Sequence, residues 1–84
     1  MADTIDEEGR VRSSSGELVP VPQQGERWAD RRDGEQVTVT AVSRSFRSGW
    51  MLVVYRRRGE PENRNEARTL IDFVDSFVPW KGSN

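Results

Sequence analysis

The sequence of 84 residues contains neither cysteine nor histidine. Without cysteine there are no disulfide bonds, thiolate zinc sites or cysteine nucleophiles. Without histidine the chain lacks the commonest metal ligand and the commonest general base near neutral pH. The length allows one domain at most, which excludes an enzyme with a cleft between two lobes. We therefore expect a protein that is not an enzyme, with no catalytic residue, no metal and no cofactor.

Long hydrophobic runs are also missing. The longest apolar run, Trp50 to Tyr55, has the length of a strand, whereas a membrane span needs roughly 18 to 20 residues. The opening segment MADTIDEEGR lacks the basic start and the apolar centre of a secretory signal. We expect no membrane partner and a location in the cytoplasm, with which the absence of cysteine agrees.

Neither sign of charge dominates, because 13 basic residues meet 14 acidic ones, but the charges are unevenly distributed. Through Glu26 two arginines meet six acidic residues, a net −4. From Arg27 to Glu60 eight arginines meet four acidic residues, a net +4, and the rest of the chain carries −1. This balance gives no bulk attraction to nucleic acid or anionic lipid. The clearest electrostatic feature is a basic middle that follows an acidic start.

The middle of the chain has the pattern of short strands. Residues 26–30 form a brief extended segment around Trp28, and the Asp33-Gly34 pair that follows is the strongest short signal for a hairpin. Residues 36–42 alternate between apolar and polar and are rich in β-branched side chains, which predicts a strand. The apolar face of this strand is expected to contain Val37, Val39 and Ala41.

Two more strands follow. Residues 50–56 are apolar on both faces, which is typical of a central strand. Residues 57–67 are expected to form an exposed loop, and residues 68–71 a fourth strand. Asp72 then caps a single helical turn, after which residues 77–80 leave room for a terminal edge strand.

Four or five short strands with one helical turn predict a mainly β fold, a small and strongly bent antiparallel sheet or barrel. A flat sheet of this size leaves one face and both edges open. Curling the sheet brings the large apolar residues into one core. The residues expected to meet there are Val37, Val39, Leu52, Val54, Ile71, Phe73 and Phe77.

Residues 1–24 are predicted to lie outside this domain. Their apolar residues are scattered among charges, serines and prolines, so little apolar surface offsets the entropy lost on ordering. We predict disorder up to about Gly16, whereas Leu18 to Pro22 either lies extended along the domain or leads into it. The expected organisation is a tail at 1–24, a domain at 25–80 and a second tail at 81–84.

The stretch GERWADRRDGEQVTVT, from Gly25 to Thr40, resembles small uncharacterised phage and prophage proteins. These begin with Gly-x-x-aromatic-x-Asp-Arg-Arg-x-Gly and continue into Val-Thr-Val-Thr, and many close with the spacing of Leu70, Phe73 and Phe77. The layout is also similar to SH3-like or Tudor/KOW-like barrels. Over residues 25–80 the resemblance implies an SH3-like antiparallel barrel and a phage origin, and it implies no catalytic residues.

The large aromatic residues have two interpretations. Exposed aromatics beside arginine stack on bases or hold a proline-rich peptide. Alternatively, they fill a small core, with Trp28 and Trp50 covering the ends of the barrel. The core interpretation is favoured for most of the set, which comprises Trp28, Trp50, Tyr55 and Trp80.

Arginines cluster around one turn of the predicted sheet. If residues 43–49 join two strands into a hairpin, Arg44 and Arg56 come near each other and produce a basic patch. Arginine forks contact phosphates well, and neighbouring aromatics add stacking. The alternative is a solvated surface neutralised by nearby acids. The candidate binding residues are Arg44, Arg47, Tyr55, Arg56, Arg57 and Arg58.

The sequence therefore predicts a small phage-type binding module that docks a protein partner, from the host or the phage, through this basic and aromatic surface. Protein is favoured over nucleic acid because the net charge is close to zero. The alternative is a nucleic-acid-binding accessory domain that uses the same patch, and salt dependence distinguishes the two. We expect a monomer or a weak homodimer that pairs through a strand edge.

Overall fold

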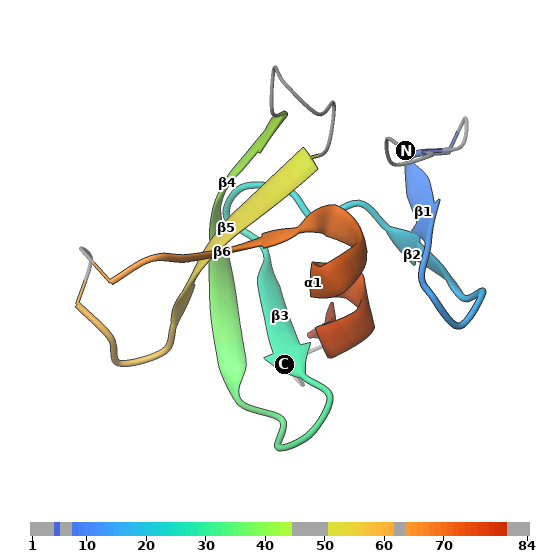
Figure 1. Ribbon diagram of the computed structural model, residues 1–84. Helices are drawn as coiled ribbons and strands as arrows, with labels where there is room; N and C mark the ends of the chain where they lie inside the picture. Colours follow the sequence, from blue (N-terminus) through green and yellow to red (C-terminus); the bar gives the residue numbers. More distant parts are fainter. Residues whose placement is uncertain (1–4, 6–7, 45–50, 62–63, 81–84) are drawn as a thin grey trace.

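The computed structural model describes residues 5, 8–44, 51–61 and 64–80, which form a mainly β structure with one short helix (Figure 1). The strands belong to two antiparallel sheets, a small hairpin and a five-stranded sheet. The elements are β1 (Arg10–Arg12), β2 (Leu18–Pro20), β3 (Arg27–Asp30), β4 (Gln36–Arg44), β5 (Met51–Arg57), β6 (Glu66–Thr69), α1 (Leu70–Ser76) and β7 (Phe77–Pro79).

The five-stranded sheet has the order β6-β5-β4-β3-β7, and every neighbouring pair is antiparallel. The last strand therefore returns to lie beside the first strand of the sheet. Within the described ranges β6 and β7 each have one strand neighbour, so the sheet is bent but open rather than a closed barrel. The predicted mainly β class is confirmed, and the predicted edge strand near the C-terminus is β7.

The predicted hairpin at Asp33-Gly34 joins β3 and β4. Gly34 has a φ of 75°, a conformation that glycine adopts without steric cost. The Asp33 carboxylate accepts a hydrogen bond from the backbone N–H of Glu35 at 2.8 Å. The backbone N–H of Asp30 donates to the carbonyl of Glu35, also at 2.8 Å, which closes the turn. Local sequence chemistry is therefore sufficient to form this connection.

A β-bulge interrupts β4 and changes which residues face the core. Val39 pairs with Tyr55 and Ala41 pairs with Val54, so the register shifts between the two positions. Val37 and Val39 are buried as predicted, but Ala41 is exposed and Val42 packs against the core instead. The prediction for Ala41 was wrong because an extra residue in one strand breaks the alternation of faces.

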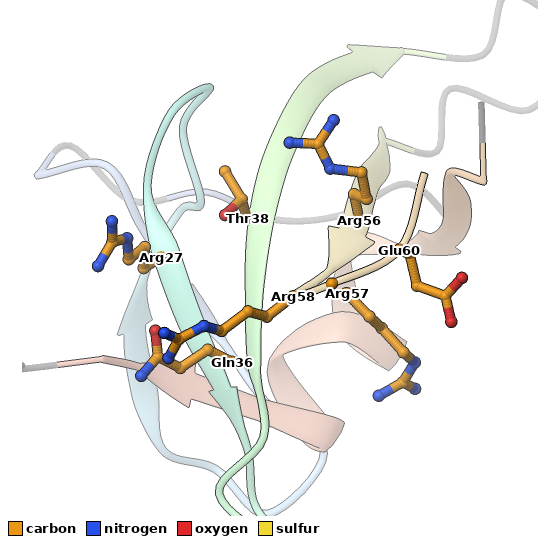
Figure 2. Close-up of a pocket in the computed structure, with 8 residues that line it drawn as sticks. Arg27, Gln36, Thr38, Arg56, Arg57, Arg58 and Glu60 are labelled. Atoms are coloured by element: carbon orange, nitrogen blue, oxygen red, sulfur yellow. The ribbon is translucent and has the colours of Figure 1, made fainter. Parts of the chain in front are cut away.

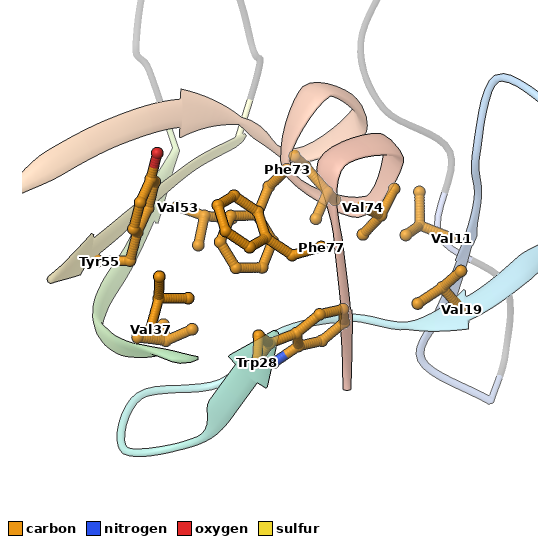
Figure 3. Packing of buried hydrophobic residues seen from close by; sticks show 11 residues of the cluster. Val11, Val19, Trp28, Val37, Val53, Tyr55, Phe73, Val74 and Phe77 are labelled. Carbon is orange, nitrogen blue, oxygen red and sulfur yellow. The ribbon is translucent and has the colours of Figure 1, made fainter. Parts of the chain in front are cut away.

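The core lies between one face of the five-stranded sheet, α1 and the N-terminal hairpin (Figure 3). Phe73 is at its centre, with its ring centroid 5.2 Å from that of Trp28 and 4.7 Å from that of Phe77. Trp28 is buried, as the core interpretation of this residue predicted, whereas Trp50 lies outside the described residues. The fully enclosed large side chains include Trp28, Tyr55, Phe73, Phe77 and Leu70.

The inward face of β5 was predicted wrongly. Val53 and Tyr55 are fully buried, whereas Leu52 and Val54 are only half-buried on the opposite side of β5. Because β5 is apolar on both faces, alternation alone does not indicate which face packs against α1.

The predicted strand at 68–71 ends at Thr69, and Leu70 and Ile71 belong to α1 instead. Leu70 is fully buried, and Ile71, which was predicted to be a core residue, is half-buried and packs against the core.

The helix α1 begins one turn earlier than the sequence indicated. Thr69 is the N-cap, and its side chain accepts a hydrogen bond from the backbone N–H of Asp72. Asp72 was predicted to be the cap, but it lies in the first turn, where a negative charge is favourable. In the part of the chain that the structure describes, no helix has the length and apolar character that a membrane crossing requires.

An N-terminal hairpin of β1 and β2 packs against the domain. Arg10–Arg12 lies in the segment that was predicted to be disordered, whereas Leu18–Pro20 lies in the segment for which an extended path along the domain was one of the two alternatives. Val11 and Val19, which pair across the hairpin, have exposed fractions of only 1% and 3% and belong to the same core cluster as Phe73 and Val74. Polar contacts fix the hairpin beside α1, because the backbone N–H of Ser14 donates to the Asp75 carboxylate at 2.8 Å. Two strands of three residues carry too little pattern for sequence analysis to detect.

Candidate binding surface

The outer face of the five-stranded sheet, defined as the face opposite α1 and the core, carries a row of polar side chains. Arg27 on β3 pairs with Thr38 on β4, and Thr38 pairs with Arg56 on β5. Side chains directly opposite each other on neighbouring strands lie on the same face. Their chain neighbours Trp28, Val37 and Tyr55 are buried in the core, so alternation directs the three polar side chains outward.

A hollow of about 240 Å³ lies on this face, and we call it the basic hollow (Figure 2). The side chain of Arg58 extends across it toward Gln36, while the side chain of Arg56 lies nearer Thr38 (Figure 2). The backbone N–H of Arg58 donates to the carbonyl of Gln36 at 3.1 Å, which positions the end of β5 against β4. The hollow is lined by Arg27, Gln36, Thr38, Arg56, Arg57, Arg58, Gly59 and Glu60.

Arg57 borders the hollow, but its side chain extends away from those of Arg56 and Arg58 (Figure 2). It pairs with Val37 and therefore belongs to the inner face, at the margin of the core. Its Nε donates to a Glu66 carboxylate oxygen at 2.9 Å, and its Nη1 lies 3.8 Å from Glu35 and 4.0 Å from Asp30. Three carboxylates therefore neutralise this arginine within the fold.

Asp30 is the most enclosed member of this ion-pair network, with an exposed fraction of 4%. Arg32 donates to it from its backbone N–H at 2.8 Å and from two guanidinium nitrogens at 3.3 and 3.2 Å. The side-chain hydrogen bonds from Arg32, followed by its backbone hydrogen bond, hold the pKa of Asp30 below the ordinary value of 3.8, and the charge of Arg57 adds to this. Asp30 is therefore ionised at neutral pH and serves to anchor the β3–β4 turn.

The three other arginines at the hollow differ from Arg57 in their surroundings. Within the described residues, the guanidinium groups of Arg27, Arg56 and Arg58 form no ion pair, and Arg27 instead lies 5.6 Å from the centre of the Trp80 ring. Among the described residues that line the hollow, Glu60 is the single acid. Three positive charges face one negative charge at neutral pH, so the basic hollow attracts anionic groups.

The predicted patch around Arg44 and Arg56 is not formed. The hairpin of β4 and β5 exists, but Arg44 pairs with Met51 while Arg56 pairs with Thr38. Arg44 and Thr38 are six positions apart along β4, which corresponds to about 20 Å in an extended strand. The prediction failed because Arg44 directly precedes the connecting segment whereas Arg56 lies near the far end of β5. Arg47, the other predicted residue on that segment, lies outside the described residues.

Tyr55, also predicted as a binding residue, is fully buried and is a core residue instead. Its hydroxyl group accepts a hydrogen bond from Nε of Arg68 at 2.8 Å and lies 3.4 Å from a Glu66 carboxylate oxygen, to which it donates. The ring packs against Phe73 and Phe77, with centroid distances of 5.4 and 5.1 Å. Tyr55 has no exposed surface with which to contact a partner.

The sequence analysis missed Arg27, Gln36 and Thr38, which line the basic hollow with Arg56 and Arg58. A signal for Arg27 was present, because an extended segment that buries Trp28 directs its neighbour to the opposite face. No local signal exists for Thr38, whose position opposite Arg56 depends on the pairing register. Of the predicted candidates that the structure describes, Arg56 and Arg58 are the two that it brings together on the outer face.

The described residues contain no group of three or more acidic side chains that could hold a metal ion. Comparisons of the chain with protein-family models, with curated proteins and with solved structures found no match. The resemblance to phage proteins therefore stays a prediction.

Proposed function

We propose that this protein is a non-enzymatic binding module that docks an acidic protein partner through the basic hollow. The observation that carries the proposal is that the arginines lie on different faces of the sheet and have different partners. Arg57 is neutralised by three carboxylates on the inner side, whereas Arg27, Arg56 and Arg58 converge on the outer side with one acid beside them. Clustered positive charges add nothing to folding, and a partner's carboxylates relieve their mutual repulsion.

A protein partner fits the electrostatics of the whole chain better than nucleic acid does. The net charge is −1, and the residues through Glu26 carry a net −4. A long polyanion that extends beyond the hollow meets this negative field, whereas a partner with a confined acidic patch does not. Arginine also suits such a partner because its planar fork binds carboxylates in a bidentate manner.

We also propose that the domain is a variant of the SH3-like barrel in which the sheet stays open. The return of β7 to the side of β3 and the bulge that bends β4 support this assignment. The absence of cysteine supports a cytoplasmic location, and the resemblance of residues 25–40 to phage proteins favours a partner from a phage or its host.

One observation favours nucleic acid as a second candidate. Trp80 has an exposed fraction of 38% and lies beside Arg27 at the edge of the hollow. An exposed aromatic ring next to arginine is a suitable platform for an unpaired base. Phosphate-driven binding falls steeply with salt, with a slope set by the number of phosphates neutralised.

The test measures binding of the full chain to a labelled hexaglutamate peptide and to an oligothymidylate strand by fluorescence anisotropy at low salt. We expect the peptide to bind and the double variant R56E/R58E to lose at least about tenfold in affinity, since each lost ion pair at a binding site costs on the order of 1.4 kcal/mol. The control is R64E, which reverses an exposed arginine that does not line the basic hollow.

Three results would contradict the proposal. The first is a wild-type protein that does not bind the peptide, and the second is a loss in R64E equal to that in R56E/R58E. The third is tighter binding of oligothymidylate with a steep salt slope, which would establish the nucleic-acid candidate instead. Circular dichroism of each variant verifies that the fold is retained.

A further inference from the structure

A second hollow of about 200 Å³ adjoins the basic hollow, and we call it the tryptophan notch. Arg27 lines both, so the two hollows are neighbours, and we call them together the strip. The walls of the notch are largely apolar rings, with one exposed tryptophan among them. Its lining residues are Pro20, Glu26, Arg27, Trp28, Pro79 and Trp80.

The order of residues along the strip follows from the strand pairing. The backbone N–H of Trp80 donates to the carbonyl of Arg27 at 3.1 Å, which extends the β3–β7 ladder by one residue. Trp80, Arg27, Thr38 and Arg56 therefore occupy one row across four adjacent chain segments. Three inter-strand spacings separate Trp80 from Arg56, which amounts to about 14 Å.

The two ends of the strip differ in chemistry. Arg56 and Arg58 lie at one end, and Trp80 with two prolines lies at the other. Glu26 is fixed at the notch, because its carboxylate accepts hydrogen bonds from the backbone N–H of Gln23 at 2.8 Å and from the indole Nε1 of Trp28 at 3.3 Å. At the notch a negative group on the partner meets Glu26 and Arg27 together, whereas at the basic hollow it meets Arg27, Arg56 and Arg58, so its attraction to the basic hollow is stronger.

We propose that the strip binds a linear segment of the partner in which a large apolar residue is followed or preceded, four positions away, by a cluster of acidic residues. The proposal rests on the function proposed above and specifies its ligand. The apolar side chain packs on Trp80 in the notch, and the carboxylates lie between Arg56 and Arg58. An extended peptide advances about 3.3 Å per residue, so four residues span the distance between the two ends.

A peptide segment fits this strip better than a single strand of nucleic acid. A nucleic-acid strand carries a phosphate at every nucleotide, so a base stacked on Trp80 places negative charge beside Glu26. A peptide, in contrast, separates its apolar residue from its acids by any number of residues. Among the described residues, Glu26 offsets the charge of Arg27 at the notch, whereas Arg56 and Arg58 at the far end of the strip have no such neighbour on their own side except Glu60. The strip therefore selects for the spacing between an apolar residue and acidic ones.

The test uses capped, fluorescent peptides that contain one leucine and three consecutive glutamates, with serine and glycine elsewhere. The leucine is placed one, four or eight positions from the first glutamate, in both chain directions, and a fourth peptide lacks it. We expect the peptide with a separation of four, in one of the two chain directions, to bind the full chain about tenfold more tightly than the leucine-free peptide does. Burial of one leucine side chain is sufficient for this gain.

Trp80→Ala should reduce the affinity of this best peptide to that of the leucine-free peptide. Leu18→Ser is the matched control, because Leu18 is a comparably exposed apolar residue that does not line the notch. This control should leave the preference for a separation of four unchanged. R56E/R58E should weaken every acidic peptide, whatever the position of its leucine.

The outcomes separate the two proposals. Equal binding at all separations, or a spacing preference that survives Trp80→Ala, overturns the linear-segment proposal while the docking function stands. Failure of every acidic peptide to bind the wild-type protein overturns both. An oligothymidylate strand that competes more strongly than the best peptide, through Trp80 and Arg56, replaces the peptide ligand with nucleic acid and also overturns both.

Discussion

Arg56, Arg57 and Arg58 are consecutive in the sequence, yet the two sides of the sheet use them differently. On the inner side, Arg57 is a structural residue whose side chain is 21% exposed and within 4.0 Å of three carboxylates. On the outer side, Arg56 and Arg58 line an open hollow and form no ion pair within the described residues. Strand alternation alone produces this separation.

The comparison shows that a run of like charges need not act as one unit. The central arginine of the run compensates acids that hold the β3–β4 turn and β6 in place. Its two neighbours contribute charge to a surface where the fold supplies few counter-charges. Substitutions on the inner side should therefore affect stability, and substitutions on the outer side should affect binding.

The strongest test of the inner side is Phe73→Ala. Phe73 is fully buried and its ring contacts those of Trp28, Tyr55 and Phe77. Removing a large buried ring leaves a cavity and costs about 3 to 5 kcal/mol, which is comparable to the whole stability of a small domain. Urea unfolding followed by circular dichroism should show a largely unfolded variant. The control is the conservative variant Phe73→Leu. If Phe73→Ala lowered the free energy of unfolding no more than this control does, the central role of Phe73 in the core would be contradicted.

The next largest effect is expected for Arg57→Glu. The new carboxylate faces Glu66, Glu35 and Asp30, so an attractive network becomes a repulsive one. The free energy of unfolding should fall by about 2 to 3 kcal/mol, as expected for breaking a partly enclosed ion-pair network. Arg58→Glu is the matched control from the same run, and it should leave the urea midpoint nearly unchanged. Equal losses in the two variants would remove the distinction between the two sides.

Some elements of the fold could be predicted from the sequence, whereas the orientation of β5 could not. The hairpin at Asp33-Gly34 and the strands at 36–42 and 50–56 were predictable, because turn chemistry and β-branched residues are local signals. Which face of β5 points toward the core was predicted wrongly, because the strand is apolar on both faces. The arginines that follow could have identified the inward face. Charged side chains such as those of Arg56 and Arg58 favour solvent, and Val54 lies on the same face of the strand, so Tyr55 on the opposite face must point inward.

The candidate site was less predictable than the fold. Proximity between Arg56, Thr38 and Arg27 depends on register across three strands, and the bulge after Val39 changes that register further along β4. The N-terminal hairpin was missed for a related reason. Val11 and Val19 are enclosed only because α1 and the sheet provide an apolar surface that is distant in sequence.

A smaller loss of stability is expected on the inner side at acidic pH, where Asp30 becomes protonated. The pKa of Asp30 is held below 3.8 in the folded state, chiefly by hydrogen bonds from Arg32. Its stabilising contribution is therefore complete above about pH 4 and is lost as the pH falls through the lower pKa of the folded state.

Asp30→Asn should cost about 1 to 2 kcal/mol at pH 7, because charge-assisted hydrogen bonds become neutral ones. In urea titrations from pH 7 to pH 2.5 the difference in stability between the two proteins should shrink as the pH falls below about 4. A difference that stays constant over this range would mean that Asp30 does not stabilise the fold as a carboxylate.

The smallest effect on stability is expected on the outer side, from the double variant R56Q/R58Q. Glutamine keeps part of the side-chain length and removes two positive charges that lie near Arg27. Because neither arginine forms an ion pair within the described residues, the loss of their repulsion should offset any lost packing. The free energy of unfolding should stay within about 0.5 kcal/mol of the wild-type value, as is usual for surface substitutions. The affinity for an acidic peptide should nevertheless fall. A destabilisation similar to that of Arg57→Glu would show that the outer arginines belong to the folding network, and the contrast between the two sides would then disappear.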